Sequence, residues 1–396
     1  MKLRILRYSV FLILLGAFFS AELLAHPGFA RKYRMSCTTC HNPAPRLKPY
    51  GEDFAGNGFV LEGEEPERYH PDTGDDLLLL QAIPPIGFRM DAYAVMKPGS
   101  DSPDISNDLQ TPYMVKFITG GRLSEWVSYY FYMYYDERGE VAGVEDAYLY
   151  FRQFLGSPVG VAIGQFQVSD PLFKRELRLT FEDYIIYTTR VGQIPLNLGY
   201  DRGIMAGYTA PFGSDFTLEI VNGNGLSDAV NRQFDDDNYK NFGLRWSHGF
   251  GPVRLGAFGY YGKYSRDEDN VTNVIGPDAT LEVGKLQINA QYLLRTDTNP
   301  MLRPTSPDDN ISTSGGLVEA IYEPDQDRSR WYLVGLYNWR SSDITDMYPT
   351  ASPLEYQSAS VAWTYLLARN FRLLTEFTYD IENETNRLVV GFFSAF

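Results

Sequence analysis

Two cysteines and a histidine stand close together near the start of the chain, in the run Cys37-Thr38-Thr39-Cys40-His41. Two thiols three positions apart, with a histidine directly after the second, are the attachment pattern of a c-type haem. In that chemistry both sulfurs bond covalently to the porphyrin vinyl groups, and the histidine supplies an axial nitrogen to the iron. The pattern predicts one covalent haem c, anchored by Cys37 and Cys40 and ligated by His41.

Three other uses of a cysteine pair fit less well, because these are the only two cysteines in the chain. A disulfide between cysteines this close would close almost no loop and constrain the unfolded chain little. A thioredoxin-type redox pair needs a βαβ surround, which this neighbourhood lacks. A zinc site needs additional ligands, usually from a second cysteine pair.

The sixth coordination position of the iron has several candidates. His26 or His70 would give bis-histidine ligation, whereas Met35 or Met90 would give His/Met ligation and a higher reduction potential. A vacant or water-bound position is a further alternative, so the sequence leaves the distal ligand open.

An export signal precedes the haem motif. Lys2, Arg4 and Arg7 make a basic start, an apolar run covers residues 10–19, and a small residue, Ala25, ends the segment. This order is typical of a secretory signal peptide, whose apolar core is too short to span a membrane as a helix. We expect residues 1–25 to be removed on export, which agrees with haem attachment outside the cytoplasmic membrane.

Residues 26–85 are predicted to form a small haem module and an acidic linker. The segment has several prolines and few aliphatic residues, so a domain of this size would be marginal without a covalent cofactor to pack around. Gly51 and Gly58 are expected to allow close approach of the backbone. The expected apolar contacts of the porphyrin are Leu47, Tyr50, Phe54 and Phe59, with Phe29 and Tyr33 at the other edge.

Beyond Pro85, apolar and polar residues alternate with a period of two up to the last residue, as in Phe216-Thr217-Leu218-Glu219-Ile220. Ten-residue stretches of this kind, separated by turn residues, are typical of transmembrane barrel strands. Residues 86–396 therefore predict an all-β outer-membrane barrel of about 16 antiparallel strands. The strands are expected near 86–97, 110–121, 124–136, 141–153, 157–167, 198–209, 214–223, 238–248, 252–264, 272–283, 286–297, 314–323, 330–341, 355–367, 370–381 and 386–396.

The connections between these strands alternate in length. Tight links recur at every second position, for example at Gly120-Gly121, Gly284-Lys285 and Arg369-Asn370, while long links cover 98–109, 168–197, 224–237, 298–313 and 342–354. Short periplasmic turns and long outer loops are the arrangement of outer-membrane barrels. Both termini then lie in the periplasm and the strand number is even. The terminal Phe396 fits recognition by barrel-assembly machinery.

Composition excludes some partners. The formal net charge is −15, and no basic stripe is present to neutralise phosphates, so nucleic acid is not expected as a partner. After the signal no apolar segment approaches the ~20 residues of a membrane helix. Two acidic triplets fall on predicted outer loops, where solvation or transient docking of cations would both suit them, at 235–237 and 267–269.

The region around the motif resembles the fused outer-membrane monohaem cytochrome–porins of iron-oxidising bacteria. The likeness rests on 25–31 (Ala-His-Pro-Gly-Phe-Ala-Arg), the haem pair, Pro45-Arg46-Leu47, Tyr50-Gly51, Phe54 and Gly58-Phe59, which together span about 35 residues. Lys32, Tyr33, Arg34, Ala44 and Glu52 depart from the pattern of the family.

The resemblance implies that electrons pass from an extracellular donor, Fe(II) in known members, through the haem to a periplasmic c-type cytochrome or other redox carrier, as in an Fe(II):cytochrome c oxidoreductase. One haem on one side of a ~30 Å hydrocarbon layer cannot serve both faces, so the module is expected within the lumen. The alternative is a diffusion porin with an accessory periplasmic haem domain. In that case the link at 168–197, which carries Phe173, Lys174, Arg175 and Arg178, would fold inward and favour anions.

Overall fold

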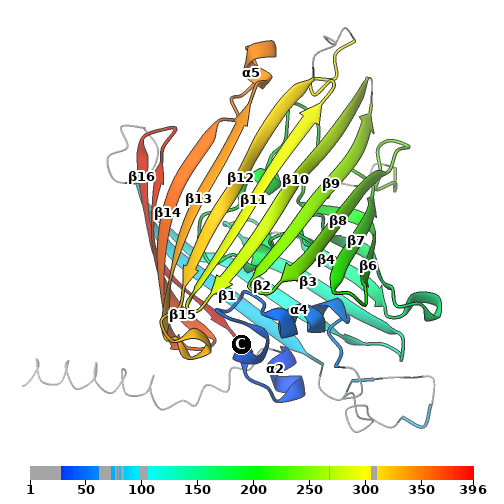
Figure 1. Cartoon of the computed structure of the whole chain (residues 1–396), viewed down its shortest axis with the longest axis vertical. Coiled ribbons are helices and arrows are strands. Elements are labelled where there is room, and N and C mark those ends of the chain that lie inside the picture. Colours follow the sequence, from blue (N-terminus) through cyan, green and yellow to red (C-terminus); the bar gives the residue numbers. More distant parts are fainter. Residues whose placement is uncertain are drawn as a thin grey trace, which may run out of the picture.

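The computed structural model describes residues 28–61, 73–75, 78, 80–81, 84–97, 106–141, 143–227, 229, 231–266, 268–304 and 310–396. Within these residues, sixteen antiparallel strands form one closed barrel in which each strand pairs with its neighbours in the chain (Figure 1). The barrel begins at Ile86 and closes between β1 and β16. The predicted barrel and its strand number are therefore confirmed.

The strands have the following bounds: β1 Ile86–Met96, β2 Asn107–Arg122, β3 Val127–Glu137, β4 Val144–Phe151, β5 Gly160–Gln167, β6 Tyr200–Thr209, β7 Ser214–Val221, β8 Asn241–Phe250, β9 Val253–Ser265, β10 Asp269–Val283, β11 Leu286–Asp297, β12 Ile311–Tyr322, β13 Trp331–Ser342, β14 Tyr356–Ala368, β15 Phe371–Asp380 and β16 Thr385–Ala395.

The two faces of the wall follow the alternation in the sequence. Along β14, Ser358 and Thr364 are both 0 % exposed, whereas Val361 and Trp363 are 57 % and 43 % exposed. Successive side chains of a strand point to opposite faces, so the small polar residues line the lumen and the apolar residues face outward. An outward apolar face is what a barrel needs in contact with lipid.

The two ends of the barrel differ. One end carries short turns and also the C-terminus, where Phe88 and Phe396 exchange backbone hydrogen bonds of 2.7 and 2.9 Å (Figure 1). The opposite end carries long loops and the short helix α5 (Ile344–Met347). We call these the short-turn end and the long-loop end. The predicted turn at Gly120-Gly121 lies instead inside β2, where a side chain at either glycine would meet Phe29 or Gln81.

The connection between β5 and β6, residues 168–199, folds into the lumen and is called the inward loop. It contains the single turns η3 (Arg175–Leu177) and η4 (Ile185–Thr188). The loop brings its own apolar residues into the barrel, where they form one buried cluster with residues of the wall. Its loop members are Val168, Leu172, Tyr184, Ile186, Tyr187, Ile194, Leu196 and Leu198, and its wall members include Phe166, Val221, Phe258, Tyr260, Val274, Leu293, Leu317 and Leu336.

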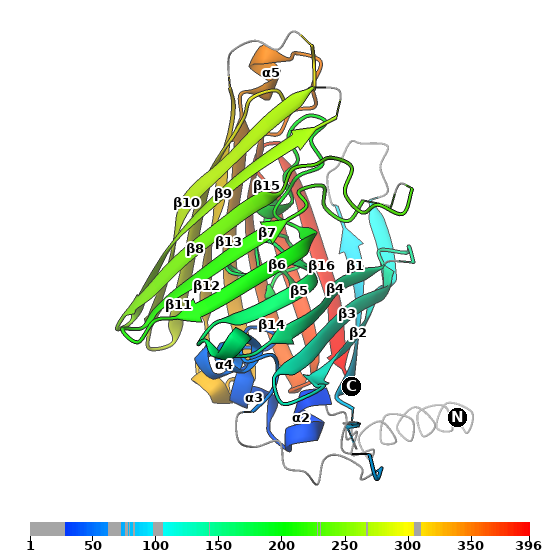
Figure 2. The ribbon, with the colours of Figure 1, turned by 90° about the vertical axis from the view of Figure 1, so that its right-hand side faces the viewer.

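The N-terminal module consists of three short helices, α2 (Gly28–Tyr33), α3 (Cys37–Cys40) and α4 (Pro49–Gly56). They lie together at the short-turn end of the barrel (Figures 1 and 2). Among the described residues, no helix is both long and apolar enough to cross a membrane.

An aromatic cluster joins the module to the wall. The ring of Phe54 meets Phe29, Tyr33 and Phe59 edge-on at centroid distances of 5.3–5.8 Å. Phe59 stacks in turn on Tyr130 of β3 at 4.4 Å. These residues were expected to contact the porphyrin, and in the structure they pack on one another and on the barrel.

Candidate haem site at the mouth of the barrel

The helix α3 is a single turn that carries both cysteines. Its first turn is capped by Ser36, whose Oγ accepts a hydrogen bond from the backbone N–H of Thr38 at 3.3 Å. Residues three apart on a helix share a face, so Cys37 and Cys40 lie on the same side. Both are free thiols and half-buried, and burial raises the pKa of each.

The imidazole of His41 is held in one orientation. Its Nδ1 lies 2.7 Å from the carbonyl oxygen of Pro45, and because a carbonyl only accepts, the proton is on Nδ1. Burial also lowers the pKa of His41, which favours the neutral ring. The free lone pair is then on Nε2. An imidazole fixed in this way through its other nitrogen is the usual form of a metal-ligating histidine.

A small hairpin positions this imidazole. The backbone N–H of Asn42 donates to Arg46 O at 3.0 Å, and that of Lys48 donates to Cys40 O at 2.9 Å. Helix α4 then crosses α3 so closely that a methyl group at Gly51 would overlap the Cys40 carbonyl oxygen. The expected close approach at Gly51 is therefore present.

Cys37 and His41 border a crevice whose other wall comes from turns of the barrel. The crevice encloses about 10 Å³, which is far less than a porphyrin occupies. The two thiols and the oriented imidazole are nevertheless the donor set of a haem c, so the residues fit the group by their chemistry. A porphyrin would need more space than this crevice has. The barrel residues of the crevice are Glu323, Gln326, Ser329, Leu366 and Arg369.

The structure places the candidates for the distal ligand in different positions. His26 and His70 lie outside the described residues. Met90 lies on the face of β1 opposite the buried lumen residues Asp91 and Tyr93, beside the outward Phe88, so it points away from the lumen. This orientation removes Met90 from the candidates for the distal ligand. Met35, between α2 and α3, is half-buried and stays a candidate. Among the described residues, no group of three His, Cys, Asp or Glu side chains is placed to hold a metal ion.

An arginine of the module reaches into the lumen. Arg46 Nη1 lies 2.6 Å from Glu319 Oε2 of β12, and the Glu319 side chain is 1 % exposed. The same carboxylate accepts hydrogen bonds from Tyr184 of the inward loop and from Asn289 of β11, each at 2.9 Å. Glu319 thus connects the module, the inward loop and the wall. Arg46 is part of the resembling segment, but its role does not follow from the sequence. The sequence feature that could have identified Glu319 is an acidic residue that stands between two apolar residues of a predicted strand, Val318 and Ala320.

Further contacts hold the module across the mouth. Lys48 pairs with Asp327 at 3.0 Å, and Glu52 of α4 pairs with Arg254 of β9 at 3.2 Å. Tyr150 of β4 donates to the carbonyl of Gly56. These partners come from opposite sides of the barrel, so the module spans the short-turn mouth, with Arg46 and Phe59 inserted into it.

The inward loop is bonded to the wall on several sides. Glu176 accepts hydrogen bonds from Lys116 of β2 at 2.7 Å and from Tyr134 of β3 at 2.6 Å. On β15, three strands from β2 around the barrel, Glu376 accepts hydrogen bonds from the backbone N–H groups of Phe181 and Glu182 at 2.6 and 2.9 Å. The inward folding expected for this segment is confirmed, and the loop is fixed rather than free in the lumen.

The cations of the loop are largely neutralised. Arg175 lies 2.6 Å and Arg178 3.9 Å from carboxylate oxygens of Asp183, and Lys174 lies 3.7 Å from Asp170. The expected preference for anions therefore loses its basis in these residues.

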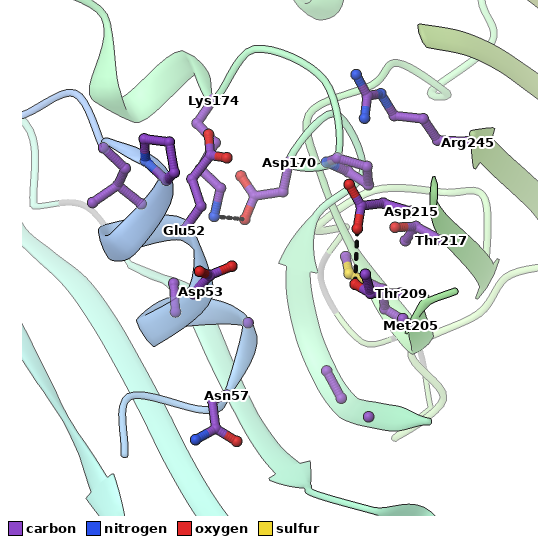
Figure 3. Close-up of a pocket in the computed structure, with 18 of the residues that line it drawn as sticks. Glu52, Asp53, Asn57, Asp170, Lys174, Met205, Thr209, Asp215, Thr217 and Arg245 are labelled. Carbon is purple, nitrogen blue, oxygen red and sulfur yellow. Dashed lines mark hydrogen bonds and ion pairs between the residues drawn. The ribbon is translucent and has the colours of Figure 1, made fainter. Parts of the chain in front are cut away.

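A vestibule of about 1150 Å³ lies between the module and the inward loop. Figure 3 shows Glu52, Asp53 and Asn57 on one side of it, with the Asp170–Lys174 pair of the loop nearby. Strand residues line the opposite side, among them Asp215 and Arg245. The lining carries both signs of charge, so it selects neither anions nor cations by net charge.

Searches of known proteins find likeness in solved structures only. No protein-family model matches the chain, and no curated protein does. The anion-selective porin from Comamonas acidovorans superposes with a TM-score of 0.57 at 10 % identity, covering 78 % of this chain and 98 % of that one. Salmonella typhi OmpF, in a complex with daunomycin, gives 0.56 at 11 %, with 78 % and 97 % covered. OmpT of Vibrio cholerae gives 0.54 at 12 %, with 78 % and 98 % covered. At these identities the likeness shows the fold, a porin-like outer-membrane barrel.

Proposed function

We propose that this chain is an outer-membrane electron-transfer protein that carries one haem c, bound by Cys37 and Cys40 and ligated by His41, at the periplasmic mouth of its barrel. Electrons would pass from an extracellular donor, with Fe(II) as the candidate that the sequence resemblance implies, to a periplasmic carrier. The observation that carries the proposal is the His41–Pro45 hydrogen bond of 2.7 Å beside two free thiols. It presents a metal-binding nitrogen next to both anchoring groups.

The filled lumen supports a role that needs no solute flow. The inward loop packs against both sides of the wall, and its Tyr187 and Val191 are 0 % exposed. The module covers the short-turn mouth below it. A bound haem supplies one-electron chemistry, while the chain orients it through His41 and the barrel holds it at the membrane.

The position of the haem motif restricts how electrons from an extracellular donor can reach it. The module was expected within the lumen, whereas Cys37 and His41 lie at the mouth of the barrel, beside the short-turn residues Gln326 and Arg369. The apolar band of such a barrel is about 25 Å tall, so electrons from an extracellular donor have to cross this depth within the barrel to reach the haem.

The test uses intact cells that export the protein. A membrane-impermeant donor, Fe(II) first, is added outside, and the haem absorbance is followed by difference spectroscopy. Reduction of the haem in the wild type, and none in a Cys37→Ala/Cys40→Ala variant, is expected. If only permeant reductants reduce the haem, the transmembrane role is wrong.

A second candidate, a diffusion porin with an accessory haem domain, is favoured by the porin-like fold and by the vestibule of about 1150 Å³. Single-channel conductance in planar bilayers separates the two. The electron-transfer proposal predicts a small conductance, whereas a large and steady open conductance supports the porin.

A further inference from the structure

Three neighbouring turns beside the haem crevice carry exposed cations. They are the turns that join β10 to β11, β12 to β13 and β14 to β15. Hydrogen bonds hold the turns together: the backbone N–H of Glu323 donates to Lys285 O at 2.9 Å, and the side-chain Nη1 of Arg369 donates to Ser329 O at 3.3 Å. We call the four cations the cationic rim: Lys285, Arg328, Arg330 and Arg369, all exposed.

The rim is positive in a chain whose formal net charge is −15. In the described part of the chain, none of its four cations forms an ion pair with a carboxylate. The exposed anions on the same turns are Asp325 and Asp327, and Asp327 already pairs with Lys48 of the module at 3.0 Å. On these three turns the exposed cations therefore outnumber the exposed anions, opposite to the chain as a whole.

The rim also lies where electrons would leave the protein. Arg369 lines the crevice together with Cys37 and His41, and Gln326, two residues before Arg328, lines it as well. A partner that binds the rim would therefore lie against the haem site. Opposite charges on two proteins speed their encounter and fix their orientation more than they raise affinity, which is what transient electron transfer needs.

We propose that the cationic rim docks an acidic, soluble electron carrier of the periplasm against the haem site. This inference rests on the proposed function, since it names the class of partner for the same site. Anionic lipid headgroups are the competing occupant, because short turns lie close to the membrane surface. The placement of Arg369 in the crevice favours a protein partner, because lipid headgroups surround the outside of the barrel.

The test uses the holo-protein in nanodiscs of neutral lipid and two probes, an acidic and a basic monohaem cytochrome c of similar size. With the haem reduced by ascorbate, electron transfer to each probe is followed by stopped flow. The rate with the acidic probe is expected to fall by about tenfold between 20 mM and 500 mM salt, and the basic probe is expected to react more slowly at low salt.

Charge-reversal variants test whether the cationic rim is the docking surface. Arg328→Glu/Arg330→Glu should slow the acidic probe about tenfold at low salt. The control Arg232→Glu/Arg266→Glu, at the long-loop end, changes the net charge equally and should leave the rate unchanged. Equal rates for both probes, or equal effects of both double variants, would overturn the proposal. A double variant that loses only binding to phosphatidylglycerol vesicles would assign the rim to lipid.

Failure of the docking proposal can be distinguished from failure of the proposed function. Haem content and reduction by ascorbate report on the haem site itself, and both double variants should match the wild type in them. Binding of the oxidised acidic probe to the chain, measured by calorimetry, needs no haem in the chain. Absence of such binding would contradict the docking proposal even if the haem is present.

Discussion

Arg46 of the module and Glu319 of β12 form an ion pair of 2.6 Å inside the lumen, 273 residues apart in the chain. Tyr184 of the inward loop binds the other oxygen of the same carboxylate at 2.9 Å. The segment that carries the haem motif and the segment that fills the barrel therefore share one anchor. Loss of this anchor is expected to loosen both.

Arg46→Met should release the module from the mouth. The change leaves the buried Glu319 carboxylate without its counter-charge, and removing one partner of a buried pair costs about 3–5 kcal/mol. Limited proteolysis of the folded barrel is expected to cut the module faster in this variant. The matched control is Lys48→Met, which breaks an exposed pair worth about 0–1 kcal/mol. Equal cleavage of both variants would mean that the Arg46 pair does not hold the module.

Gly51→Ala should impair haem attachment. A methyl group there would overlap the Cys40 carbonyl oxygen, so α4 must move away from α3, at a cost of about 1–3 kcal/mol. Gly56→Ala, in the same helix, meets nothing within 4 Å and is the control. Haem staining after denaturing electrophoresis should fall for Gly51→Ala alone. Equal staining of the two variants would show that the close approach is not needed.

Docking of the module should weaken as the pH rises. Burial, with a contribution from Asp327, raises the pKa of Glu323 from 4.5 to about 7. The docked state therefore holds a proton that the exposed carboxyl would release, and stability is lost progressively from about pH 4.5 up to pH 7. Protease release of the module should be faster at pH 8 than at pH 6. Glu323→Gln should remove much of this difference, and an unchanged pH dependence would rule out Glu323 as its cause.

Arg387→Ala should raise the conductance of the barrel. Arg387 of β16 pairs with Glu182 of the inward loop and lies 3.5 Å from Glu376, which holds the same stretch of loop. Without this cation two buried carboxylates repel each other, so the loop should open more often. Planar bilayers should then show larger or more frequent openings. Lys263→Ala, near the long-loop end of β9, breaks a pair with Asp269 outside the lumen and is the control. If both variants conduct alike, the cation does not hold the loop closed.

Local patterns in the sequence predict the barrel well, whereas the contacts that close it come from distant residues. Alternation places Ser358 and Trp363 on opposite faces of β14, and turn residues separate the strands, because both effects are local. The role of Gly120 and Gly121 depends on Phe29 and Gln81, far away in the chain, so a turn was predicted where the structure has a strand.

In the haem site, too, some residues can be predicted from the local sequence and others depend on distant parts of the chain. Spacing alone identifies Cys37, Cys40 and His41, since the chemistry requires those residues in that order. The wall of the crevice could not be predicted, because Glu323 and Arg369 come from turns whose side chains have no periodic signal. The aromatic residues of the module have contacts with the protein that the sequence did not predict. Phe59 packs on Tyr130 of the barrel, a partner that only the closed fold reveals.

The central claim is that one haem is covalently attached through Cys37 and Cys40. Intact-mass spectrometry of the denatured protein, purified from outer membranes, tests it most directly. We expect the mass of the chain from residue 26 plus one haem, and loss of the added mass in Cys37→Ala/Cys40→Ala. A wild-type protein with the mass of the bare polypeptide would contradict it.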